Sequence, residues 1–174
     1  MPTPIRSILF ATNLSQSCVP ALIHSAYLAA HHSAMLILLH VVDSDVPELI
    51  EKHLESALGK ERFLKIKQEH EQDARETLIG KMTPGKLGQK AIKQYCLDAG
   101  QDPDKFEFNW QHLVVAGKDR VASIIKQARE HNCSLIVIGS TKGLLKAQAV
   151  GPTVKGLLEK SKIPVLVVPP GEEE

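Results

Sequence analysis

Aromatic residues are scarce in this 174-residue chain: they make up 4% of it, with a single tryptophan. So few rings argue against the stacking platforms on which single-stranded nucleic acids bind. The charge balance offers no attraction to duplex nucleic acids or anionic membranes, because 21 basic and 20 acidic residues leave a formal net charge of +1. We therefore expect neither a nucleic acid nor a membrane as the main partner.

Cysteine and long apolar runs are scarce as well. The three cysteines are an odd number without a Cys-x-x-Cys pair, so a reducing cytoplasm is the expected compartment. No apolar run reaches the roughly 20 residues that a membrane span needs, and the N-terminal residues lack the layout of a secretory signal. The eight histidines show no ligand spacing with cysteine or carboxylate partners, so no metal site is predicted.

The remaining composition is that of a globular protein. Apolar residues make up 43% of the chain and charged residues 24%. A chain of this length can bury a substantial core, so we expect one domain that covers residues 1–174.

The stretch Ser134–Pro170 carries the strongest pattern. Apolar Leu135–Ile138 runs into the loop Gly139–Gly143, Gly151 opens a helical pattern, and Ile163–Val168 is a second apolar run. This order predicts a strand, a glycine loop, a helix and a second strand. In open parallel sheets ligands bind beyond the carboxyl ends of the strands, and a helix N-terminus at that edge favours anions.

Strand and helix patterns alternate through the rest of the chain. Continuous apolar runs predict buried parallel strands at residues 7–11, 34–43 and 109–117. Helical periodicity is found at residues 18–29, at 46–81 with an interruption at 59, at 87–99 and from 119 onward. The alternation predicts a doubly wound α/β domain.

Local signals predict several boundaries. Ser15 or Ser17 is the expected cap of the first helix, with Pro20 in its first turn. Asp119 is the expected cap of the helix that follows the third strand, and Thr83–Lys86 is a predicted turn.

Three places together resemble the universal stress protein family: Ile8–Ser15, Leu39–Val42 and, above all, the stretch from Ile138–Ser140 through Val165–Val168. The likeness covers nearly the whole chain and is thinnest from about Leu58 to Phe108. There this chain is longer than a typical member, with an enlarged connection at about 83–108. The resemblance implies a five-stranded parallel sheet of strand order 3-2-1-4-5 with helices on both faces, and a dimer.

The resemblance also implies a site for ATP or another adenine nucleotide. Many members bind it through a Gly, two residues, Gly, nine residues, Gly-Ser/Thr motif, with the adenosine held by a carboxylate after the first strand and by backbone near the end of the second. Carried onto this chain, the implied binding residues are Thr12, Asn13, Val41, Gly139, Lys142, Gly143, Gly151 and Thr153.

The chain departs from this motif in two places. Asn13 replaces the carboxylate, so it can form hydrogen bonds but supplies no charge. Lys142 stands where the second glycine is expected, with Gly143 one position later, and the loop is one residue short. Pro152 then occupies the Ser/Thr position, which removes a hydroxyl and a backbone N–H; Thr153 offers a substitute hydroxyl.

Two functions follow from the sequence. The first is a universal stress protein-like dimer that binds an adenine nucleotide in the stress response. The alternative is a nucleotide-free dimeric interaction module whose glycines serve only the turn. An enzyme is the weakest third possibility, because no catalytic constellation is visible. The last strand, Val165–Val168, is expected at a sheet edge, where it would pair with a second copy.

Overall fold

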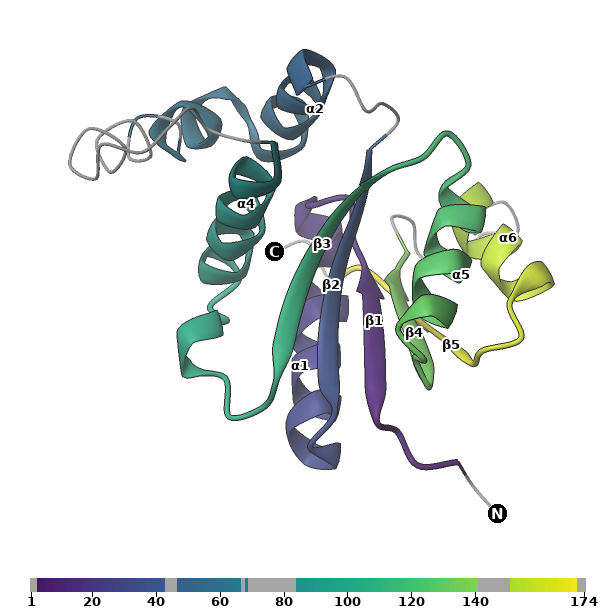
Figure 1. The fold of residues 1–174 in the computed structure, drawn as a ribbon. Helices are drawn as coiled ribbons and strands as arrows, with labels where there is room; N and C mark the ends of the chain where they lie inside the picture. Colours follow the sequence, from purple (N-terminus) through teal and green to yellow (C-terminus); the bar gives the residue numbers. More distant parts are fainter. Residues whose placement is uncertain (1–2, 43–46, 67, 69–83, 141–150, 172–174) are drawn as a thin grey trace.

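The uninterrupted apolar runs of the sequence form the strands of one parallel sheet, shown in Figure 1 for the computed structural model of the protein. The structure describes all residues except 1–2, 43–46, 67, 69–83, 141–150 and 172–174. Within this part of the chain the strands are β1 Ser7–Ala11, β2 Met35–Val42, β3 Trp110–Ala116, β4 Leu135–Gly139 and β5 Val165–Val168. All neighbours pair in parallel, in the order β3-β2-β1-β4-β5. The predicted fold class and strand order are confirmed.

Helices cover both faces of this sheet. Their bounds are η1 Gln16–Cys18, α1 Val19–His32, α2 Pro47–Leu58, α4 Pro84–Asp98, η2 Pro103–Lys105, α5 Arg120–Glu130 and α6 Pro152–Lys160. Helical residues 60–66 follow α2 after Gly59, whose φ of 89° ends that helix. In Figure 1 α1 and α4 lie on one side of the sheet, and α5 and α6 lie on the other. None of the helices in the described ranges combines the length and apolar character needed to cross a membrane.

The three central strands β1, β2 and β4 bury both of their faces, which explains why their runs are apolar without alternation, and the edge strands β3 and β5 are partly buried. In β2, Leu36 and Leu38 pack toward α1 and α4, whereas Ile37 and Leu39 pack toward α5 and α6. These four side chains are at most 1% exposed. The sheet is therefore a rigid platform, and its carboxyl edge is where loops and helix ends meet.

Helix α4 falls in the stretch where the sequence predicts an enlarged connection, and it is part of the core. Ala91, Ile92, Tyr95 and Cys96 are each at most 2% exposed and pack on the sheet face shared with α1. Burial raises the pKa of the Cys96 thiol to about 12, so that this thiol stays protonated. The segment contributes packing to the fold as well as length to a connection.

Some predicted boundaries are confirmed and others are wrong. Asp119 caps α5, since its Oδ1 accepts a hydrogen bond from the Ala122 N–H at 3.0 Å. Ser15 and Ser17 do not cap α1: Cys18 stands at its cap position, and the two serine hydroxyls bond one another at 2.8 Å. The predicted turn at 83–86 is also wrong where it is described, because α4 begins at Pro84, a residue preorganised for a first helical position.

Candidate functional site

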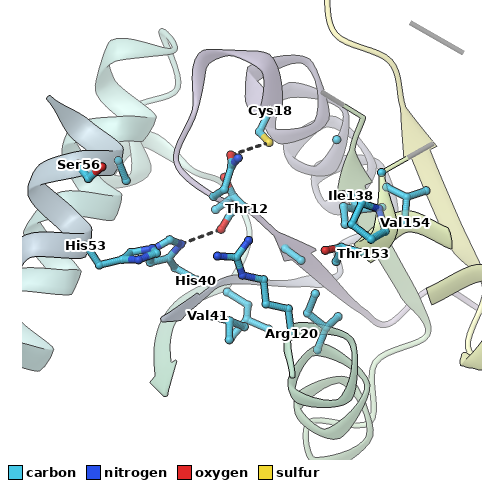
Figure 2. Close-up of a pocket in the computed structure, with 18 residues that line it drawn as sticks. Thr12, Cys18, His40, Val41, His53, Ser56, Arg120, Ile138, Thr153 and Val154 are labelled. Atoms are coloured by element: carbon cyan, nitrogen blue, oxygen red, sulfur yellow. Dashed lines mark hydrogen bonds between the residues drawn. The ribbon is translucent and has the colours of Figure 1, made fainter. Parts of the chain in front are cut away.

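A cavity of about 430 Å³ lies at the carboxyl edge of the sheet, beyond β1, β2 and β4. Figure 2 shows it bordered by residues of several elements, with Thr12 after β1, His53 on α2, Arg120 on α5 and Thr153 on α6. The chain leaves β1 toward β2 and leaves β4 toward β5, so the strand order reverses between β1 and β4. Open α/β sheets bind their ligands at such a reversal point.

Six of the eight residues implied by the family motif lie in the described part of the chain, and all six line this one cavity. They are Thr12, Asn13, Val41, Gly139, Gly151 and Thr153. Lys142 and Gly143 lie outside the described residues. The structure brings the six together from four separate parts of the sequence; their role in binding stays a prediction.

Thr12 is fixed to the neighbouring strand at the end of β1. Its backbone N–H donates to the Leu39 carbonyl at 2.9 Å, and its own carbonyl accepts from His40 Nδ1 at 2.8 Å. Because a carbonyl only accepts, His40 carries its hydrogen on Nδ1. The Thr12 hydroxyl oxygen accepts from the Leu14 N–H at 2.9 Å, which holds the loop after β1 in a tight turn.

The side-chain oxygen of Asn13 accepts hydrogen bonds from residues of the same loop. Oδ1 accepts from the Ser15 N–H at 3.0 Å, from the Ser15 hydroxyl at 2.6 Å and from Cys18 Sγ at 3.1 Å. Because the Ser15 backbone N–H can only donate, the side-chain atom of Asn13 that faces it must be the amide oxygen and not the nitrogen. The amide nitrogen, with its two N–H groups, is then what Asn13 offers to a ligand.

A second support for this loop comes from α4. The Tyr95 hydroxyl donates to the Ser15 carbonyl at 3.1 Å, and the ring is 2% exposed. Burial raises the pKa of Tyr95 above its ordinary range, so the hydroxyl remains a neutral donor. A residue 80 positions away in the sequence therefore helps to shape the cavity wall.

The two motif glycines that the structure describes have different environments. A methyl group on Gly139 would lie 3.1 Å from Cys18 Cα and 3.2 Å from its Sγ, so close packing against η1 favours glycine there. A methyl group on Gly151 would meet no heavy atom within 4 Å, and φ of −59° suits any residue. Packing thus explains Gly139 and leaves Gly151 unexplained.

Gly151 is the N-cap of α6, and Pro152 and Thr153 are its first two residues. First-turn N–H groups of a helix lack intrahelical partners and, with the helix dipole, attract anions. Pro152 has no N–H, which leaves those of Thr153 and Val154 in this turn. No acidic residue lies in the first turn to compete with an anionic ligand.

Several cavity residues are absent from the motif. His40 and His53 lie with ring centroids 5.0 Å apart at the α2 side, Cys18 is beside Asn13, and Arg120 is the first residue of α5. One signal marks Arg120 in the sequence: a cation directly after a helix cap opposes the helix dipole. No local signal marks His53, because only the tertiary fold brings α2 to this edge.

The described residues offer no metal centre and no acidic group in the cavity. They contain no cluster of three or more histidine, cysteine, aspartate or glutamate side chains that could hold a metal ion. None of the described lining residues is an aspartate or a glutamate. The polar lining consists instead of hydroxyls, one amide, two imidazoles and a guanidinium.

The solved structures that resemble this one have the same fold at low sequence identity. A universal stress protein in complex with cAMP is 18% identical, with a TM-score of 0.57 over 97% of this chain and 100% of that one. UspA from Lactobacillus plantarum is 21% identical, with a TM-score of 0.54 over 96% and 99%. The universal stress protein from Archaeoglobus fulgidus in complex with dAMP is 13% identical, with a TM-score of 0.52 over 95% and 99%.

Sequence comparison identifies the family directly. No match is found among curated proteins. The model of the universal stress protein family matches residues 4–169, which is most of the chain and includes every strand. This protein therefore belongs to the universal stress protein family.

Proposed function

We propose that this protein binds an adenine nucleotide, ATP or a close relative, in the cavity at the carboxyl edge of its sheet. The observation that carries the proposal is that Thr12, Asn13, Val41, Gly151 and Thr153 line one cavity of about 430 Å³. That volume suits a small-molecule ligand, and the position is the usual one for ligands of this fold class. Two of the similar structures are complexes with an adenine nucleotide, one with cAMP and one with dAMP.

The phosphate end of the ligand belongs at α6. The backbone N–H groups of Thr153 and Val154 and the positive end of the helix dipole attract an anion there, and the Thr153 hydroxyl adds one donor. The adenosine end belongs over the central strands, where Leu39 and Val41 of β2 and Ile138 of β4 provide apolar contact. The nucleotide would thus span the point at which the strand order reverses.

The proposed role is binding without turnover. His40, the buried imidazole of the cavity, uses its Nδ1–H on the Thr12 carbonyl. Within the described lining, no serine or cysteine hydrogen-bonds to a histidine as an activated nucleophile would. The protein would then act in the stress response, as a cytoplasmic homodimer, according to whether its nucleotide is bound.

One observation favours the nucleotide-free alternative. The close contact with Cys18 accounts for a glycine at position 139 without a bound phosphate. The same contact makes Gly139→Val unsuitable as a test, because its bulk would disturb the fold as well as the site. Gly151 is the better position, since its surroundings leave room for a side chain.

Calorimetric titration with ATP, AMP and cAMP tests the proposal. The wild-type protein should bind at least one of them saturably with one site per chain. Gly151→Val should weaken that binding about tenfold or more, because it puts bulk beside the anion-binding helix end, while its far-ultraviolet circular dichroism stays that of the wild type. A wild-type protein that gives no heat with any of the three contradicts the proposal and supports the interaction module.

A further inference from the structure

We propose that His53 of α2 is a base-binding residue of the cavity. Its imidazole ring would stack on the purine of the bound nucleotide, and this contact would distinguish a nucleotide from a sugar phosphate that lacks a base. The inference rests on the proposed function and adds to it a residue that determines ligand specificity. None of the residues implied by the family motif lies on α2.

Helix α2 has two faces with different environments. Leu54 and Leu58 are 0% and 7% exposed and belong to the core that α2 shares with α4. His53, Ser56 and Ala57 line the cavity instead. These three follow the i, i+3, i+4 spacing of one helical face. Helix α2 therefore presents a continuous wall to the cavity.

The ring of His53 packs on a second ring that is itself fixed. The ring centroids of His53 and His40 lie 5.0 Å apart with 46° between the ring planes, a distance typical of aromatic pairs. His40 is 1% exposed, and its Nδ1 donates to the Thr12 carbonyl at 2.8 Å. Figure 2 shows His53 directed from α2 toward His40. A side chain that is placed before binding loses little conformational freedom when a ligand contacts it.

Imidazoles are the aromatic rings that the described lining offers. The described residues around the cavity include no phenylalanine, tyrosine or tryptophan. His40 is buried, whereas His53 is partly exposed, so His53 is the ring that a ligand can reach. Unpaired bases bind to proteins by stacking on aromatic side chains, histidine among them. His53 thus suits the planar base of a nucleotide.

The place of α2 in the fold also suits the base end of the ligand. Figure 1 shows α2 and α6 apart from one another, with the ends of β1, β2 and β4 between them. With the phosphate at the N-terminus of α6, the ribose lies over these strand ends and the base reaches α2. Leu39 and Val41 of β2, the strand that precedes α2, add apolar lining.

Stacking on His53 leads to a particular selectivity. Every base has a flat face, and the contact grows with the size of the ring system, so the wall formed by α2 favours purines over pyrimidines. The contact does not use the edge of the base. It therefore selects a purine without itself separating adenine from other purines.

Calorimetric titration with AMP, CMP and ribose 5-phosphate tests the inference. The three ligands carry the same 5′ phosphate and differ in the ring attached to the sugar. The wild-type protein should bind AMP about tenfold or more tightly than ribose 5-phosphate, as expected for one stacked base, with CMP between the two.

Variants of α2 assign the effect to the ring. His53→Ala removes it and keeps a good helix former, so AMP binding should weaken about tenfold while ribose 5-phosphate binding stays within about twofold. His53→Phe keeps a flat ring without the imidazole nitrogens and should hold AMP affinity within about threefold of wild type. Melting temperatures verify each fold, and His53→Leu, which has no flat ring, replaces the alanine variant if that variant does not fold.

Lys52→Ala is the matched control. Lys52 is an exposed neighbour of His53 on the same helix and does not line the cavity. This variant should bind all three ligands as the wild-type protein does.

Several results would overturn the inference. A wild-type protein that binds ribose 5-phosphate as tightly as AMP does so and leaves nucleotide binding itself standing. Unchanged AMP affinity in His53→Ala, or equal losses of AMP and ribose 5-phosphate, shows that His53 does not contact the base. A His53→Phe variant as weak as His53→Ala assigns the effect to the imidazole nitrogens and not to stacking. A wild-type protein that binds none of the three ligands overturns the inference together with the proposed function.

Discussion

The loop after β1 owes its shape to two buried donors from distant parts of the chain. His40 Nδ1 donates to the Thr12 carbonyl at 2.8 Å, and the Tyr95 hydroxyl donates to the Ser15 carbonyl at 3.1 Å. Leu14 lies between the two accepting residues, Thr12 and Ser15. Its φ of 63° is a left-handed conformation that costs a non-glycine residue about 1 kcal/mol. The surrounding hydrogen bonds stabilise a turn that the residue itself disfavours.

Replacing Tyr95 by phenylalanine tests this support. The substitution keeps the ring and removes the hydroxyl, so the free energy of unfolding should fall by about 1 kcal/mol. Tyr27→Phe is the matched control, since Tyr27 is 69% exposed and its change should stay within about 0.5 kcal/mol. Urea denaturation of the three proteins measures both values. Equal stabilities of wild type and Tyr95→Phe would contradict the role given to this hydrogen bond.

His112 makes the stability of the protein depend on pH. Burial lowers its pKa from the ordinary value of 6.5, so below that pH the unfolded chain takes up the proton more readily than the folded protein. The contribution of this residue is therefore fully favourable above pH 6.5 and is lost as the pH falls through the lowered folded pKa. His112→Gln, which does not titrate, should lose less stability than the wild type between pH 7.5 and pH 5. Parallel losses in urea denaturation at the two pH values would show that His112 does not contribute.

At the scale of elements, local hydrogen bonds and close packing fix the turn between β3 and α5. Asp119 caps the helix, and the Ser123 hydroxyl donates to the Asp119 carbonyl at 2.8 Å. A side chain on Gly117 would lie 2.1 Å from Ser123 Oγ, which requires that hydroxyl to move. This packing sets where α5 begins and hence where Arg120 meets the cavity.

The cap should be measurable by substitution. Asp119→Ala removes the acceptor of the Ala122 N–H and should cost about 1 kcal/mol of unfolding free energy. Asp119→Asn keeps an acceptor at the same place and should restore most of that loss. Urea denaturation distinguishes the two. An asparagine variant as unstable as the alanine variant would mean that the charge or another contact, and not the cap, accounts for the effect.

Elements whose signals are local can be predicted from the sequence, and others cannot. Asp119 followed by an apolar period predicts α5, because cap and stripe are adjacent in the chain. The start of α1 is predicted at the wrong residue, since Ser15 and Ser17 bond to neighbouring side chains and a 3₁₀ turn intervenes. Propensity alone does not reveal which partner a serine hydroxyl takes.

The candidate site follows the same division at the scale of the whole molecule. The residues at strand and helix ends, such as Thr12, Val41 and Thr153, can be placed at one edge from the parallel topology. His53 and Tyr95 cannot, because their helices reach the site through packing on the sheet, and no period in the sequence encodes that docking. The sequence therefore predicts the cavity residues at strand and helix ends better than those contributed by the helices that pack beside the cavity.

The exposed edge of the sheet gives a prediction about assembly. β5 ends the sheet, as the sequence predicts. The carbonyls of Pro164, the residue before β5, and of Val168 face β4, where they accept from the N–H groups of Ile136 and Ser140. By the alternation of a strand, Val165 and Val167 direct their backbone groups outward, where a second copy can pair.

Sedimentation at micromolar concentration should therefore show a homodimer. Val167→Pro removes one outward N–H and should shift the protein toward monomer, because the β4 pairing does not use that group. Circular dichroism verifies that the variant keeps its fold. A monomeric wild-type protein at this concentration would contradict the dimer.

The central claim, that the cavity holds an adenine nucleotide, is tested most directly by a crystal structure of the protein grown with saturating AMP. Electron density for the nucleotide is expected in this cavity, with the 5′ phosphate within hydrogen-bond distance of the Thr153 and Val154 N–H groups and the adenosine over Val41. A cavity without nucleotide density at saturating concentration, or density confined to another surface, would contradict it.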